Sequence, residues 1–399
     1  MGDDRYSRQS LIQWWSQERL RAARVLIAGV GALGNEVAKN LALLGVGTLI
    51  LVDFDRIERS NLSRTVLFKE SDVGHSKAAR AARALRALNP DLAVYPCDGD
   101  LFYDLGLGIY RHCDLTIGCL DSIAARSQAG RCCGLTGVPY LDGGMWSLGG
   151  EARWLLSGDG PCFDCTISAD DRAEAQLRRS CTGFAPPADT QDQPHLPTVA
   201  TTASIIGGLL AQECAKFLCG HAIEAGKSIV YNGQYLTMHR AQLSRRPDCP
   251  ASHVPYGDVI ELPGGAAQTT AADLIARARV DLARAWFPSG GGADTVPPAG
   301  DAIEVQLTRN FALAMVCPGC GRRQRVQRHW SRVPESARPC PACGTLREAQ
   351  VVQALGADSQ HLHTPLSRLG VPPGEILPVY IGGGILFYEL TSDIPGLCA

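Results

Sequence analysis

The chain has 399 residues, with 38 Lys and Arg against 40 Asp and Glu and a formal net charge of −2. At about 150 residues per domain this length predicts two or three domains, and near-neutrality argues against a general nucleic-acid binder, whose affinity comes mostly from neutralising phosphates. Because the sequence has no run of 18 apolar residues and starts with a polar stretch, we expect neither a membrane-spanning helix nor a secretion signal, and we predict a cytoplasmic protein.

Near its start the sequence predicts a strand, a glycine loop, a helix and a second strand in succession. Residues 24–28 (R-V-L-I-A) are typical of a short buried strand, and G-V-G-A-L-G follows at 29–34. Residues 35–44 carry apolar side chains at helical spacing, and residues 48–52 (T-L-I-L-V) predict a second buried strand. This βαβ unit predicts an α/β fold with a doubly wound, Rossmann-like parallel sheet.

The alternation of strands and helices continues to about residue 156. The apolar runs predict helices at 76–88 and 122–134, and strands at 92–96, 115–119, from 139 and at 151–156. A Pro-rich stretch at 178–198 then predicts a long surface loop. After it we expect a strongly apolar helix at 198–218 and an edge strand at 228–231.

The composition shifts near residue 250, where glycine- and proline-rich breaks begin. We therefore predict an N-terminal domain over residues 1–255 and a smaller C-terminal domain over residues 256–399. The second domain should contain a helix at 270–286 and a cysteine-rich module at about 305–347. The tail beyond residue 345 has too little periodicity to predict its fold.

The glycine loop is the first chemical signal. Glycines between a strand and a helix let the backbone approach a phosphate, and the helix N-terminus supplies free N–H groups and the positive end of a dipole. An acidic residue about 20 positions further on can hold ribose hydroxyls, and Asp53 lies 24 residues after Gly29. By itself this pattern predicts a nucleotide, with NAD as the default and a ligand-free turn as the alternative.

The next segment favours a nucleoside triphosphate over NAD. Residues 53–64 read D-F-D-R-I-E-R-S-N-L-S-R, and V-G-H-S-K follows, ending at Lys77. Arg and Lys side chains at these positions would stabilise phosphate charge as pyrophosphate departs. Asp121 is expected just past the carboxyl end of a strand, where a parallel sheet places groups that face the ligand. A carboxylate there can bind Mg²⁺.

These motifs resemble those of the ubiquitin-activating enzyme superfamily, in its bacterial adenylyltransferase branch (ThiF, MoeB and HesA). The resemblance covers about residues 5–253 and rests on R-Y-S-R-Q at 5–9, the glycine loop, D-F-D…S-N-L-x-R, V-G-x-x-K and C-L-D ending at Asp121. It departs from the family at Ala32, where Gly is frequent, and at Ser122, where Asn is frequent. Neither departure removes a charge, so activity is still expected.

The resemblance implies a role for each matching residue. The nucleotide would be bound by the glycine loop, by Asp53 at the ribose, by the neighbouring Asp55 and by phosphate-contacting side chains. Asp121 would bind Mg²⁺, and Arg8 would reach into the site of a partner subunit, which implies a homodimer. The full set of implied nucleotide-binding residues is Gly29, Gly31, Ala32, Gly34, Asp53, Asp55, Asn61, Arg64, Lys77 and Asp121.

Four of the 16 cysteines form two Cys-Pro-x-Cys-Gly knuckles. Cys317 and Cys320 form the first, and Cys340 and Cys343 form the second. Paired C-x-x-C motifs at this separation are typical of a structural zinc ribbon, in which four thiolates bind Zn²⁺ as a tetrahedron. Such a site stabilises a module that has little core of its own. The arginines between the knuckles form a local basic face, which we interpret as solvated or protein-docking.

A second zinc site is implied by the resemblance. Cys162 and Cys165 lie where the family has half of such a site, and the other half should be a C-x-x-C near residue 250. Here that segment reads Cys249-Pro-Ala-Ser-His253. Imidazole can replace a thiolate as a zinc ligand, so we predict a Cys₃His site, with a lost site as the alternative.

Cys181 is a candidate nucleophile in R-R-S-C-T-G, within the predicted loop. The resembling enzymes that form a thioester or persulfide have a Cys in the matching loop. Arg172, Arg178 and Arg179 lie nearby in the sequence and would lower the pKa of the thiol. The alternative is an ordinary loop cysteine. His195 is more simply a solvated loop residue.

The prediction is ATP-dependent adenylation of the C-terminal glycine carboxylate of a ubiquitin-like or sulfur-carrier protein. Arg8, Arg64, Lys77 and Asp121 would stabilise the transition state, and Cys181 could then form an enzyme thioester. A downstream conjugating protein would suit a bacterial ubiquitin-like conjugation system. The alternatives are a different carboxylate, on a peptide or on modified tRNA, a NAD-dependent dehydrogenase, and a non-catalytic nucleotide-binding scaffold.

Overall fold

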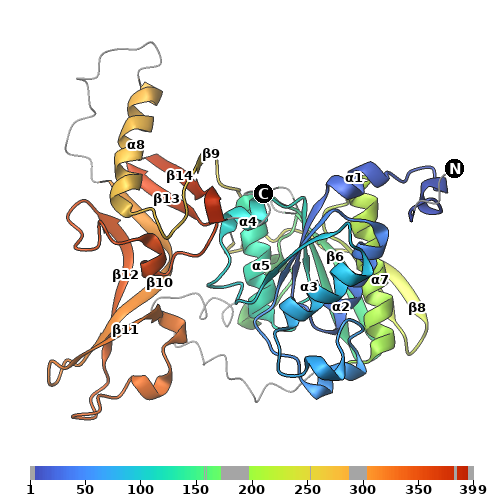
Figure 1. The fold of residues 1–399 in the computed structure, drawn as a ribbon, viewed down its shortest axis with the longest axis horizontal. Helices are drawn as coiled ribbons and strands as arrows, with labels where there is room; N and C mark the ends of the chain where they lie inside the picture. Colours follow the sequence, from blue (N-terminus) through green and yellow to red (C-terminus); the bar gives the residue numbers. More distant parts are fainter. Residues whose placement is uncertain are drawn as a thin grey trace. The chain divides into compact units, whose positions relative to one another are not determined.

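The computed structural model describes residues 5–171 apart from 157 and 159, residues 197–286 apart from 252, and residues 303–393 apart from 382 and 383. It divides the chain into two compact units (Figure 1). The first unit comprises residues up to 102, residues 110–176 and residues 193–255. The second unit includes residues 103–109 and the chain from residue 256 onward. No described helix is long and apolar enough to span a membrane.

The first unit is built on an eight-stranded sheet in the order β3-β2-β1-β4-β5-β6-β7-β8. The strands from β3 to β5 are parallel, and those from β5 to β8 are antiparallel. The strands are β1 (Arg24–Ala28), β2 (Thr48–Val52), β3 (Ala93–Cys97), β4 (Leu115–Gly118), β5 (Tyr140–Trp146), β6 (Gly149–Leu155), β7 (Lys227–Asn232) and β8 (Thr237–Gln242). The doubly wound α/β fold is thereby confirmed. The prediction of an edge strand at 228–231 was wrong, because β8 pairs along β7 and places it inside the sheet.

Helices cover both faces of this sheet, with α2, α3 and α7 on one face and α5 on the other (Figure 1). The strands β1 and β2 are buried on both faces, which explains their unbroken apolar runs. Each predicted helix forms, and its ends differ from the prediction by a few residues. The α-helices are α1 (Gln17–Ala22), α2 (Ala32–Leu44), α3 (Lys77–Leu88), α4 (Leu107–Arg111), α5 (Ile123–Thr136) and α7 (Ala200–Leu218).

The second unit contains a six-stranded sheet in the order β11-β10-β13-β14-β9, with β12 also paired to β10. Its core joins buried residues of α8, such as Leu274, to Val305, Leu355 and Tyr388 of the strands. The chain beyond residue 345, whose fold the sequence did not predict, supplies three of the strands. The elements are β9 (Val259–Leu262), α8 (Ala271–Trp286), β10 (Glu304–Val316), β11 (Arg323–His329), β12 (Glu348–Gly356), β13 (Ile376–Ile381) and β14 (Gly384–Leu390).

Residues 103–109 belong to the second unit although they lie between β3 and β4 of the first in the sequence. The Arg309 guanidinium donates to the Leu105 carbonyl at 2.6 Å, and the Leu107 amide donates to Glu375 Oε1 at 3.3 Å. The Gly108 amide donates to the Gly374 carbonyl at 2.8 Å. These bonds satisfy the backbone of a short inserted segment, as a buried segment requires.

Candidate functional site

The glycine loop lies at the carboxyl end of β1, where the order of the sheet reverses between β1 and β4. Gly29 has φ +89°, and a Cβ there would lie 2.5 Å from the Cys119 carbonyl oxygen. A Cβ at Gly34 would lie 2.0 Å from the Gly29 carbonyl oxygen, whereas one at Gly31 would meet nothing within 4 Å. Ligands in doubly wound sheets bind at such a switch point. Gly29 and Gly34 therefore allow close packing, and Gly31 leaves open space at the N-terminus of α2.

Ala32, the departure from the family pattern, is the first residue of α2 and is buried. Gly31 is the N-cap residue, and it has an ordinary negative φ of −74°. The methyl group of Ala32 is thus part of the packed start of the helix. No described feature of this turn conflicts with an approaching phosphate.

Asp53 follows β2 and holds the glycine loop through a hydrogen bond to its backbone. Its Oδ2 accepts from the Val30 amide at 2.7 Å, and its Oδ1 accepts from the Asp55 amide at 2.8 Å. Burial raises the pKa of this carboxyl, and the nearby Lys77 ammonium partly offsets that effect. Asp53 therefore lies beside the loop at the carboxyl edge of the sheet, as its implied ribose-binding role requires.

The predicted phosphate-binding residues lie in the segment after β2. Lys77 is the first residue of α3, and its Nζ is 2.7 Å from Asp55 Oδ2. Arg64 follows the 3-10 turn Arg59–Ser63 and donates through Nη1 to the Ser60 carbonyl at 2.7 Å. Asn61 lies in that turn and accepts from the Glu58 amide at 3.0 Å. The cations are thus held by local partners that a triphosphate would have to replace.

Asp121 is exposed just beyond β4. The strand leads to it through Cys119, whose amide donates to the Ala28 carbonyl at 2.7 Å, next to the glycine loop. Ser122 then caps α5 by accepting from the Ala125 amide at 3.2 Å. The carboxyl ends of β1, β2 and β4 thus bring Gly29, Asp53 and Asp121 to one edge of the sheet.

Two predicted catalytic residues are not brought to this edge by the described structure. Arg8 is exposed, and its guanidinium has no hydrogen-bond or ion-pair partner among the described residues. The nearby Tyr6 anchors the segment, because its hydroxyl accepts from Asn89 Nδ2 at 2.9 Å. Cys181 lies outside the described residues, as do the neighbouring Arg172, Arg178, Arg179 and His195.

The Cys₃His site that the resemblance implies is assembled in the first unit. The Sγ of Cys162 is 3.8 Å from that of Cys165 and 3.6 Å from that of Cys249, and Cys165 Sγ is 3.5 Å from His253 Nε2. Tetrahedral zinc with bonds of about 2.3 Å separates its sulfur ligands by about 3.8 Å. Burial and the neighbouring thiols raise the pKa of Cys162, an electrostatic cost that a divalent cation would relieve. The four residues therefore fit a metal ion.

The predicted Cys₄ site, formed by the two knuckles, lies in the second unit. Cys317 and Cys343 have Sγ atoms 3.4 Å apart, and those of Cys320 and Cys340 are 3.6 Å apart. Both knuckles close in the same way, since the amide of the glycine after each pair donates to the carbonyl of its first cysteine. The Thr345 hydroxyl and amide lower the pKa of Cys343 to about 6. Backbone amides also lower the pKa of Cys340, so that two of the four convergent thiols are biased towards thiolate. The four could also hold a metal ion.

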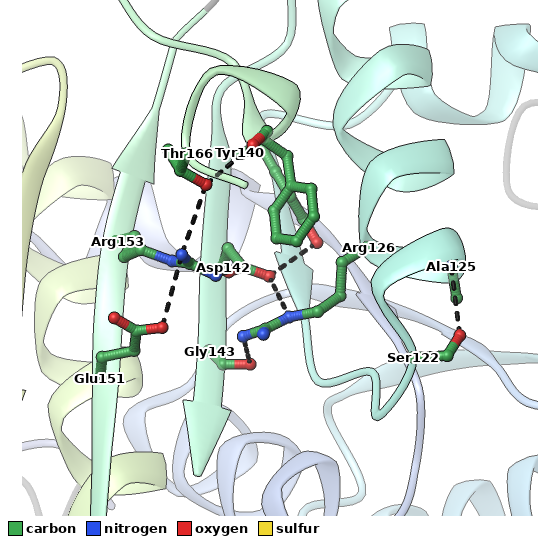
Figure 2. A network of polar contacts seen from close by, with 10 residues as sticks. Ser122, Ala125, Arg126, Tyr140, Asp142, Gly143, Glu151, Arg153 and Thr166 are labelled. Atoms are coloured by element: carbon green, nitrogen blue, oxygen red, sulfur yellow. Dashed lines mark hydrogen bonds and ion pairs between the residues drawn. The ribbon is translucent and has the colours of Figure 1, made fainter. Parts of the chain in front are cut away.

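The sequence did not predict a buried polar network one strand beyond Asp121 (Figure 2). At its centre Asp142 of β5 contacts Arg126 of α5, Arg153 of β6 and the Tyr140 hydroxyl. The one signal in the sequence is a carboxylate directly after apolar residues, in Y-L-D-G-G at 140–144, a pattern that is typical of the end of a strand. β5 in fact continues to Trp146, so Asp142 lies inside the strand.

Known proteins resemble the first unit. The ThiF family matches residues 6–251. The molybdopterin-synthase adenylyltransferase of Escherichia coli K12 is 32% identical over 251 residues, 61% of this chain and 94% of that protein. The SAMP-activating enzyme E1 of Haloferax volcanii is 31% identical over 269 residues, 65% of this chain and 92% of that protein. A crystal structure of E. coli MccB with ATP shares the fold, with a TM-score of 0.51 and 24% identity, over 63% of this chain and 74% of that one.

Proposed function

Because the chain belongs to the ThiF family, we propose that it is an ATP-dependent adenylyltransferase. Its substrate is the C-terminal glycine carboxylate of a ubiquitin-like or sulfur-carrier protein. The relatives named for this activity match along more than nine-tenths of their own length. The observation that carries the proposal is the convergence of the glycine loop, Asp53 and Asp121 at the β1–β4 switch point.

The described residues support a simple in-line substitution at phosphorus. A carboxylate oxygen of the carrier attacks the α-phosphorus of ATP, the bond to the bridging oxygen of the β-phosphate breaks, and pyrophosphate leaves with that electron pair. Asp53 binds the ribose, and the open space at Gly31 admits the phosphates to the start of α2. Lys77 exchanges Asp55 for phosphate oxygens and, with Arg64, stabilises the charge of the departing pyrophosphate.

Asp121 is the proposed ligand of Mg²⁺. The ion would neutralise phosphate charge. An exposed carboxylate just past β4 suits this role, since magnesium keeps several of its waters and is bound through one or two carboxylates. Arg8 is proposed to act in the site of a second copy, in a homodimer, because it is exposed and unpaired among the described residues.

Both cysteine clusters are proposed to bind Zn²⁺ in structural sites, since each presents four protein ligands and leaves no position for substrate. The Cys₄ site would stabilise the region around the knuckles of the second unit, which we propose recognises the carrier or a downstream conjugating protein. Cys181 is proposed to attack the acyl-adenylate through its thiolate, so that the acyl–phosphate bond breaks, AMP leaves and a thioester forms. We also propose a bacterial, cytoplasmic setting and a domain boundary at residue 255.

ATP–pyrophosphate exchange with Mg²⁺ tests the proposal. Exchange that requires a carrier ending in Gly-Gly, and that Asp121→Ala abolishes, is the expected result. The matched control is Asp91→Ala, which removes an exposed carboxylate before β3, at the opposite end of the parallel strands. Exchange with a peptide or tRNA carboxylate instead would identify an alternative substrate. ATP binding without exchange would favour a scaffold, and NAD binding without ATP binding would favour a dehydrogenase.

A further inference from the structure

The polar network around Asp142 joins one fully buried carboxylate to two guanidinium groups. Asp142 has no exposed surface, and its Oδ1 accepts from Arg126 Nε and from the Tyr140 hydroxyl, each at 3.0 Å. Its Oδ2 accepts from Arg153 Nε at 3.0 Å and from Nη2 at 2.5 Å. One buried carboxylate therefore lies between two guanidinium groups, and Glu151 supplies the second negative charge of the network.

The two guanidinium groups are not equivalent. Arg153 has a second carboxylate partner, because its Nη1 is 3.4 Å from Glu151 Oε1 and also 3.4 Å from the Thr166 hydroxyl. Arg126 uses Nε on Asp142 and Nη2 on the Gly143 carbonyl at 2.8 Å. Among the described residues nothing accepts from its Nη1. The unused donors thus belong to Arg126, whose side chain is 15% exposed.

Arg126 lies on the helix that begins just after the proposed Mg²⁺ ligand. It is in the first turn of α5, and its amide donates to the carbonyl of Ser122, the residue after Asp121. Asp142 pairs in register with Gly118, near the end of β4. In Figure 2 the strand that carries Asp142 and Gly143 points towards the side on which Ser122 and the start of α5 lie. This is the carboxyl edge of the sheet, where ligands bind in such folds.

Gly144 supports this arrangement. A Cβ at this position would lie 2.4 Å from Arg126 Nη2 and 3.4 Å from Nη1. The strand residue beyond Gly143 therefore has no side chain to block the guanidinium. The Phe163 ring packs on it from another side, with its centroid 5.5 Å from Arg126 Cζ.

The proposed reaction would gain from a cation that receives the nucleophile. The nucleophile is a carboxylate, and it must approach a triphosphate that is itself negatively charged. In the proposed function Arg64, Lys77 and a Mg²⁺ held by Asp121 would serve the phosphates, and Arg8 would come from a second copy. A guanidinium with free donors, fixed in orientation by a second carboxylate, is well suited to a carboxylate ligand.

We propose that Arg126 binds the terminal carboxylate of the acyl substrate, and that Asp142 is a positioning residue that orients Arg126. This inference rests on the proposed function and deepens it, since it names the group that receives the nucleophile. Arg126 lowers the free energy of the approach of two anions and directs one oxygen at the α-phosphorus. Arg153 binds the second oxygen of Asp142, Oδ2. Arg126 therefore needs only its Nε for Asp142 and keeps other donors for the substrate.

Steady-state exchange kinetics test this assignment. Arg126→Gln should raise the KM for the carrier about ten- to a hundredfold, the effect of losing a charged hydrogen bond, and leave the KM for ATP within about twofold. Asp142→Asn should shift the same parameter by less, because the guanidinium stays but is held less firmly. Arg131→Gln, on the exposed face of the same helix, is the matched control and should change neither constant. Equal changes in both KM values, or an unchanged KM for the carrier, would overturn the proposal.

A second readout does not depend on the true carrier or on turnover. The probe is N-acetyl-Gly-Gly, with its C-terminal amide as a control that lacks the carboxylate. Saturation-transfer NMR should detect the acid but not the amide on the wild-type protein, and Arg126→Lys, which keeps the charge, should bind more of the acid than Arg126→Gln. If the acid binds equally to all three proteins, Arg126 is not the receptor. If no carrier supports exchange and yet the acid binds through Arg126, the proposed function fails and the carboxylate site remains.

Discussion

Replacing the three glycines of the loop by alanine, one at a time, should separate two requirements of the turn, which are close packing within the first unit and open space for the phosphates. At Gly29 the new Cβ would lie 2.5 Å from a backbone oxygen of Cys119, with φ at +89°. A left-handed residue costs about 1–2 kcal/mol and overpacking costs about 1–3 kcal/mol. Gly29→Ala should therefore lower the free energy of unfolding of the first unit by about 2–5 kcal/mol.

Gly34→Ala should also destabilise the first unit, because its Cβ would lie 2.0 Å from the Gly29 carbonyl oxygen. Gly31→Ala should not. Its φ of −74° suits any residue, and its Cβ would enter open space. The loss of an N-cap glycine should cost no more than about 1 kcal/mol.

For Gly31→Ala the expected defect is in ligand binding. A methyl group in the space where the phosphates approach the backbone should weaken ATP binding at least about tenfold, a difference of about 1.4 kcal/mol. Thermal unfolding and equilibrium ATP binding would measure the two effects on each variant. Wild-type ATP affinity in Gly31→Ala would refute the phosphate path, and wild-type stability in Gly29→Ala would refute the packing argument.

Three further predictions concern charge and metal. Lys77→Met should weaken ATP binding at least about tenfold with little loss of stability, because the 2.7 Å contact with Asp55 involves a half-exposed carboxylate; unchanged binding would remove Lys77 from the site. Burial, with Arg309 and Arg332 nearby and Asp104 opposing them, lowers the pKa of His329 to about 4. The unfolded state therefore binds more protons below about pH 6.5, and lowering the pH towards 4 should destabilise the second unit by about 3 kcal/mol, an effect that His329→Phe should flatten in acid-unfolding curves. Metal analysis should find two zinc ions per chain, and Cys340→Ser should retain one; a full complement in that variant would place the second ion elsewhere.

Local patterns explain what the sequence predicted. The apolar run at 24–28, the glycine loop and the apolar run at 48–52 specify a βαβ unit through neighbouring residues alone, and the structure forms that unit. The Cys₄ cluster could likewise be predicted from the spacing of its two knuckles. The other cluster joins residues as far apart as Cys165 and His253, and only the family resemblance implied it.

Long-range pairing explains what the sequence did not predict. The segment 103–109 joins the second unit through Arg309 and Glu375, partners more than 200 residues away. No periodicity within seven residues encodes such partners. The strands β13 and β14 were missed for a related reason. Residues 376–390 are apolar without alternation, and their places in the sheet depend on pairing with β10 and β9, which lie far away in the sequence.

Buried carboxylates occur in both units, and their partners distinguish their roles. Glu375 accepts from the backbone amides of Leu107 and Ile376, from the Thr308 hydroxyl and from the Arg309 guanidinium. Because Arg309 also donates to the Leu105 carbonyl, this carboxylate and its cation together satisfy the main chain of the inserted segment. The carboxylate of Asp142 accepts from side chains, two guanidinium groups and a phenol. Apolar residues of similar volume often stabilise a core as well as or better than such an ion group. Asp142 is therefore better explained by what it does for Arg126 than by a contribution to stability, and the substrate carboxylate is the partner that gives this orientation a purpose.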